Sequence, residues 1–83
     1  MEMHEVWANP TTLLTLDGRV LEVFGFTDAQ RFHLAFRPVL QRSTKLVTIK
    51  PESGPQLSFF YDRENADRLD AFGRLLEAAH PPR

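Results

Sequence analysis

An Asp17-Gly18 dipeptide between two apolar runs limits the fold of this chain more than any other local pattern. Asp-Gly flanked by apolar and β-branched residues is the strongest short-range signal for a β-hairpin. Because glycine has no Cβ, Gly18 can adopt a positive φ without a steric clash. The sequence therefore predicts strands over about residues 11–16 and 19–25, joined at Asp17-Gly18, and a turn over residues 26–29.

Three further strand patterns follow this hairpin. Residues 31–37 alternate between apolar and polar or small side chains, and this period of two is typical of a half-buried strand. Pro38 has no N–H donor, so it marks the end of that strand, an edge or a bulge, and residues 39–40 can extend the strand beyond it. The sequence predicts the next strands over about 45–50 and 56–61, with a Pro- and Gly-rich turn between them. The last strand carries aromatic side chains on both faces, so we expect both faces to be covered.

A helical pattern closes the chain and predicts a helix over about residues 64–79. Its apolar and small side chains repeat at three- and four-residue steps: Ala66, Leu69, Phe72, Gly73, Leu76 and Ala79. Either Asp62 or Asn65 is a suitable N-cap, and Pro81-Pro82 stops the helix. Gly73 costs about 1 kcal/mol in a helix interior, and its missing side chain favours a close approach to the sheet. Opposite charges four residues apart predict surface ion pairs: Arg63–Asp67, Glu64–Arg68 and Asp70–Arg74.

The N-terminal segment around Val6 and Trp7 is either one more strand or a tail that packs its tryptophan on the core. The expected fold class is α+β, in one domain over residues 1–83. It consists of an antiparallel, strongly bent sheet or partial barrel of five or six strands, packed by one C-terminal helix. The predicted core consists of Leu14, Leu16, Val23, Phe32, Leu34, Phe36, Val47, Ile49, Leu57, Phe59, Leu69, Phe72 and Leu76.

Several classes of chemistry lack their sequence signals. The chain has no cysteine, which excludes disulfides and thiolate ligands and fits a cytoplasmic protein. No apolar run approaches the roughly 18 residues of a membrane span, and residues 1–10 do not resemble a secretory signal. No phosphate-binding glycine loop or Gly-x-Ser-x-Gly motif is present. We therefore expect a non-enzymatic protein without a cofactor or metal ion.

Charge is distributed unevenly along the chain, although the formal net charge is only −1. Residues 29–50 carry five basic residues and no acid, between an acidic first third and a mildly acidic last third. The candidate binding residues are Arg31, His33, Arg37, Arg42, Lys45 and Lys50. Two readings stay open: this region binds an acidic partner such as a phosphorylated lipid, a nucleic acid or an acidic peptide, or acids elsewhere in the fold neutralise it. The pI near 6.3 counts against a dedicated nucleic-acid binder.

The pattern resembles that of a small bacterial pleckstrin-homology-like (PH-like) domain. The resemblance rests on the hairpin at Asp17-Gly18, the alternating residues 31–37, the strands over 45–50 and 57–61, and the closing helix. It implies a binding scaffold without catalysis, used for protein–protein contact, lipid head groups or oligomerisation. The family binds head groups through basic residues between its first two strands, and the loop identified as that one, residues 16–19, has only Arg19 and also carries Asp17.

The function that we expect is therefore a non-catalytic protein-interaction or scaffold module, acting on a protein partner or through self-association. The alternative is a binder of nucleic acid or another phosphate-bearing ligand through residues 31–50. The two differ in their salt dependence, since counterion release makes binding to a nucleic acid steeply dependent on salt.

Overall fold

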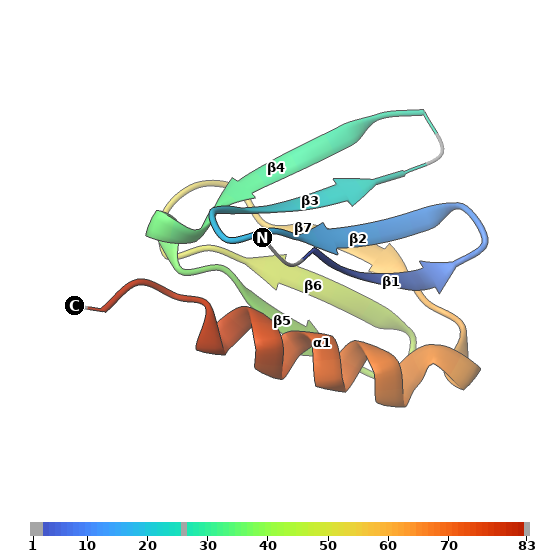
Figure 1. Cartoon of the computed structure of the whole chain (residues 1–83). Helices are drawn as coiled ribbons and strands as arrows, with labels where there is room; N and C mark the ends of the chain where they lie inside the picture. The colour runs from blue at the N-terminus through green and yellow to red at the C-terminus, as the bar shows by residue number, and fades with distance from the viewer. Residues whose placement is uncertain (1–2, 26, 83) are drawn as a thin grey trace.

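The computed structural model describes residues 3–25 and 27–82, which form two antiparallel sheets and one C-terminal helix (Figure 1). The first sheet has the order β1-β2-β3-β4 and contains β1 (His4–Asn9), β2 (Thr12–Leu16), β3 (Val20–Phe24) and β4 (Ala29–His33). The second sheet has the order β5-β6-β7 and contains β5 (Val39–Arg42), β6 (Leu46–Lys50) and β7 (Leu57–Phe60). Two 3₁₀ turns, η1 (Leu34–Phe36) and η2 (Arg63–Asn65), and the helix α1 (Ala66–Ala78) complete the fold.

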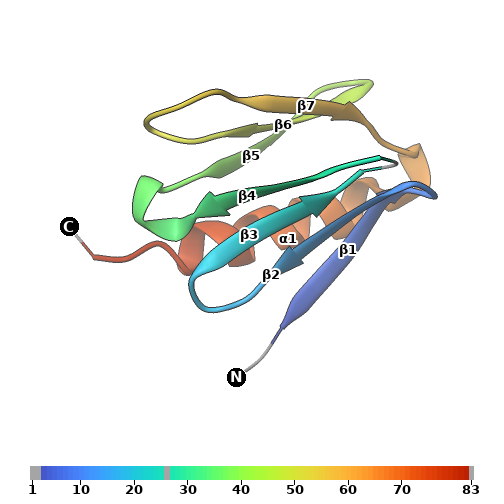
Figure 2. The same cartoon turned by 90° about the horizontal axis from the view of Figure 1, so that it is seen from above.

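The α+β class is confirmed, but the expected single bent sheet or partial barrel of five or six strands is wrong. Seven strands divide into separate sheets of four and three, which Figure 2 shows as distinct layers. The N-terminal segment is the additional strand β1, and residues 39–42 form their own strand β5 rather than an extension of β4. The turn expected over residues 26–29 includes Phe26, which lies outside the described residues.

The predicted strand over residues 31–37 ends early, at His33. The chain then tightens into η1, and Arg37 adopts a left-handed conformation with φ 51°. Two long-range hydrogen bonds hold this turn: the Leu34 N–H donates to the Arg19 carbonyl at 3.0 Å, and the Glu52 N–H donates to the Phe36 carbonyl at 2.9 Å. The turn carries the chain from the first sheet to the second, which an uninterrupted strand would not do.

The hairpin predicted at Asp17-Gly18 is confirmed as the β2–β3 connection, but its turn chemistry differs from the expectation. Among the described glycines, Gly54 rather than Gly18 has a positive φ. The Asp17 carboxylate instead accepts the N–H groups of Arg19 at 2.7 Å and Val20 at 2.9 Å. These two bonds favour the charged form and lower the pKa of Asp17 below its usual range.

The core lies between the two sheets and α1. Its buried apolar side chains are Val6, Ala8, Leu14, Leu16, Leu21, Val23, Phe32, Leu34, Val47, Ile49, Leu69, Phe72 and Leu76. Leu57 and Phe59 are half-buried and pack against this core. Phe36, predicted in the core, is 50% exposed because η1 turns it outward. Phe60 is 69% exposed, so the outer face of β7 is not covered as expected.

Helix α1 lies against β1 and β5, an edge strand of each sheet (Figures 1 and 2). It buries Leu69, Phe72 and Leu76 there. Neither Asp62 nor Asn65 makes the predicted side-chain cap. The Asn65 amide instead donates to the Ala8 carbonyl at 3.2 Å, which ties the start of the helix to β1.

Gly73 faces Leu40 of β5 where helix and sheet meet. A Cβ added to Gly73 would lie 3.5 Å from the Leu40 Cβ, which is an ordinary van der Waals contact. The close approach therefore leaves room for a methyl group and excludes longer side chains.

We accordingly expect Gly73→Ala to raise the free energy of unfolding by about 0.5 to 1 kcal/mol, since alanine is the better helix former. Gly73→Leu should lower it by at least about 1 kcal/mol, because the longer side chain must displace Leu40. Urea unfolding monitored by circular dichroism measures both values. A destabilised Gly73→Ala variant would contradict this description of the contact.

Candidate functional site

The six predicted basic binding residues come from both sheets and from the turns next to them. Arg31 and His33 lie on β4, Arg37 follows η1, Arg42 ends β5, Lys45 lies in the β5–β6 turn and Lys50 ends β6. The Arg31 Nε donates to Glu22, its cross-strand neighbour on β3, at 3.1 Å. The Arg37 guanidinium donates to the Pro81 carbonyl and thereby holds the segment after α1. Three of the six residues therefore already have a hydrogen-bond partner within the fold, and binding of an acidic ligand by residues 29–50 stays a prediction.

Arg42 makes the strongest polar contact of this group, with Asp70 of α1. Its Nε and Nη2 atoms donate to the two carboxylate oxygens at 2.8 and 2.9 Å, and its Nη1 donates to the Tyr61 hydroxyl at 3.0 Å. The bidentate contact with Arg42 lowers the pKa of Asp70 and raises the pKa of Arg42. Asp70 was expected to pair with Arg74 along the helix, but Arg42 is its ion-pair partner within 4.0 Å among the described residues.

Arg31 and His33 do lie together, and both line a hollow with Asp17, Arg19 and Val20. They also line a pocket of about 210 Å³ against the exposed Phe36 and the β6–β7 turn. Glu22 forms an ion pair with Arg31, and the Asp17 carboxylate lies close enough to Arg19 and Arg31 to interact with their charges. Acidic side chains from elsewhere in the fold therefore neutralise the charges of Arg31 and Arg42, as the second reading of the sequence expected.

The Arg42–Asp70 pair makes a pH-dependent contribution to stability. Because the folded pKa of Asp70 is below its ordinary value of 3.8, the contribution is complete above that value and is lost as the pH falls through the folded pKa. Wild type should therefore be more stable than Asp70→Asn at pH 7, and the difference should be smaller at pH 2, below the ordinary pKa of the carboxyl group. Urea unfolding at both pH values measures it. Arg42→Gln should abolish the same pH dependence; a constant difference between wild type and Asp70→Asn would contradict the assignment.

The more prominent surface feature is an apolar row on the outer face of the first sheet. The strand register places Trp7 of β1 opposite Leu13 of β2, and Leu13 opposite Phe24 of β3. Trp7 is 53% exposed and Phe24 is 38% exposed. Large exposed side chains that lie in one row are unusual for a surface that contacts only water.

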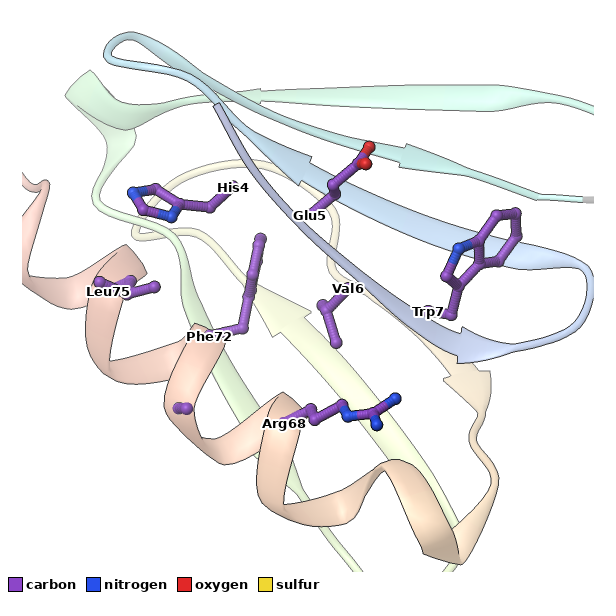
Figure 3. A pocket seen from close by; sticks show the side chains of 8 residues that line it. His4, Glu5, Val6, Trp7, Arg68, Phe72 and Leu75 are labelled. Atoms are coloured by element: carbon purple, nitrogen blue, oxygen red, sulfur yellow. The ribbon is translucent and has the colours of Figure 1, made fainter. Parts of the chain in front are cut away.

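Trp7 separates two hollows. On one side, a pocket of about 310 Å³ is lined by Trp7, Leu13, Phe24 and the β1–β2 turn. On the other side, a groove of about 330 Å³ lies between β1 and α1, and its lining includes Trp7, Phe72 and Leu75 (Figure 3). Leu75 is 42% exposed. We call Trp7, Leu13, Phe24 and Leu75 the Trp7 surface.

Sequence reasoning missed this surface, although it singled out Trp7. The alternation Val6-Trp7-Ala8 is the available signal, because a strand that buries Val6 and Ala8 must point Trp7 outward. The neighbours of Trp7 come from β2, β3 and α1, and the sequence does not fix the register that assembles them.

In residues 3–25 and 27–82, no three His, Asp or Glu side chains gather as a metal site would need. The single long helix there, α1, is too short and too polar to cross a bilayer. Comparisons with protein-family models, curated proteins and solved structures gave no match.

Proposed function

We propose that this chain is a non-catalytic protein-interaction module of PH-like type. Seven antiparallel strands in sheets of four and three, followed by one C-terminal helix, are compatible with PH-like topology. In such a module, the sheets and helix are a rigid support, and the function belongs to the surface that they present.

The Trp7 surface is the observation that carries this proposal. Tryptophan is enriched among the residues that dominate protein–protein binding energy, because it contributes a large apolar area with few rotatable bonds. Trp7 is held in place by its strand, Leu13 and Phe24 continue its row across the sheet, and Leu75 adds apolar area at the other end of the adjoining groove. A protein partner that covers these side chains removes them from water, which is favourable by about 25 cal/mol per Å² of apolar area.

An acidic lipid or nucleic acid is the second class of ligand, and the geometry supports it less well. The first two strands are β1 and β2, so the loop between them is Pro10-Thr11, which carries no basic residue. The loop that the sequence suggested for a head group, at Asp17-Gly18, is the β2–β3 connection. Arg31 and Arg42 contact the carboxylates of Glu22 and Asp70.

The proposal predicts that binding depends on Trp7. Random 12-residue peptides displayed on phage and selected on the immobilised chain should yield binders whose affinity falls at least about tenfold on Trp7→Ala, the loss typical of a dominant interface residue. Phe60→Ala is the matched control, because Phe60 is an exposed aromatic side chain on the other sheet. This variant should bind the same peptides as wild type.

Thermal unfolding should show that Trp7→Ala remains folded, since the Trp7 side chain is only half-buried. Selected peptides that bind wild type and Trp7→Ala equally well, or a selection that yields no peptides, would contradict the proposal. Light scattering on wild type and on Trp7→Ala tests whether the partner is a second copy of the chain. In that case, wild type should be a dimer and Trp7→Ala a monomer.

A further inference from the structure

We infer that the groove between β1 and α1 binds an extended segment of a partner protein in which a carboxylate lies near a large apolar residue. The inference rests on the proposed function and adds the chemistry of the partner. It is carried by three features of one groove: an edge strand, an apolar floor and an arginine that has no hydrogen bond or ion pair with the residues that the structure describes.

The first feature is the position of β1 at the edge of its sheet. An edge strand presents main-chain N–H and C=O groups on the side away from its neighbour, and an extended peptide can pair with them. At the end of β1 nearest η2, the Ala8 carbonyl already accepts the Asp62 N–H at 2.7 Å and the Asn65 amide at 3.2 Å. For Glu5–Trp7, β2 supplies the strand pairing among the described residues, so this stretch keeps a free edge beside the groove.

The second feature is the apolar lining of the groove. Val6 and Phe72 are buried and form its floor, while Trp7 and Leu75 are exposed and line it toward its two ends. Figure 3 shows Phe72 rising from α1 toward β1, with Trp7 and Leu75 toward opposite ends of the groove. This lining suits an apolar side chain of the partner, placed against Phe72.

The third feature is Arg68, which extends from α1 beside the groove (Figure 3). Within residues 3–25 and 27–82, Arg31 and Arg42 have carboxylate partners, but Arg68 makes no hydrogen bond or ion pair. The expected Glu64–Arg68 pair along the helix is likewise not formed in this part of the chain. An arginine that lines an apolar groove and has no carboxylate partner in the described part of the chain is suited to a carboxylate of the partner protein.

The groove also contains acidic and titratable groups that a partner must accommodate. Glu5 belongs to the outer face of the sheet and points away from α1 in Figure 3. His4 lies at the far end of the groove from Trp7. Arg68 extends beside the groove while the Glu5 carboxylate points away from it, so the charge that a bound segment meets there favours an acidic segment over a basic one.

The inference predicts that reversing one charge reverses the preference of the groove. On wild type, the displayed 12-residue library should yield peptides with Asp or Glu at a fixed spacing from a large apolar residue. Synthetic copies of these peptides should bind Arg68→Glu at least about fivefold more weakly. Selection on Arg68→Glu should instead enrich Lys or Arg at that position. Arg63→Glu is the matched control, since Arg63 is exposed in η2 and does not line the groove, and it should leave the selection unchanged.

Hydrogen exchange tests the extended geometry of the bound segment. Binding of an acidic peptide should slow amide exchange in β1 over Glu5–Trp7, because the edge strand gains a neighbour. Unchanged exchange in β1 would overturn the strand pairing. Peptides that require Trp7 but bind wild type and Arg68→Glu equally well would overturn the carboxylate assignment and leave the proposed function standing. Selected peptides that bind Trp7→Ala as tightly as wild type would contradict both this inference and the proposed function.

Discussion

The burial of one face of α1 between two sheet edges is the interaction on which this structure depends. In the described part of the chain, β1 and β5 are edge strands, and each pairs with a neighbouring strand on one side only. Helix α1 packs against both strands and covers the apolar side chains there. Leu69, Phe72 and Leu76 fill that space, and complete burial of side chains of this size contributes about 1.5 to 3 kcal/mol each. The Arg42–Asp70 contact fixes the same helix to β5 from the outside.

The same packing creates the groove to which we assign partner binding. Phe72 reaches the core and also forms the floor of the groove, so the support and the binding surface share a residue. Trp7 and Arg68, by contrast, belong to the walls and contribute little to the core. This division explains how a chain of 83 residues can keep apolar side chains on its surface without weakening its interior.

Local patterns predicted the hairpin at Asp17-Gly18, the strand β6 and the helical stripe, because each depends on neighbours close in sequence. The prediction of one strand over residues 31–37 was wrong, because η1 is held by hydrogen bonds with residues distant in sequence: the Arg19 carbonyl accepts one and the Glu52 N–H donates the other. The basic site was predicted from composition, but the partners of Arg31 and Arg42 come from β3 and α1. Trp7 was noticed, yet its surface could not be predicted, because strand register places Leu13 and Phe24 beside it.

The most direct test of the central claim uses the single tryptophan of the chain as its own reporter. The fluorescence of Trp7 should be that of a partly hydrated indole in the free chain. When a selected peptide is added at saturation, the emission should shift to shorter wavelength and acrylamide should quench it less, because the partner covers the side chain. Binding that leaves both the emission maximum and the quenching of Trp7 unchanged would contradict the account.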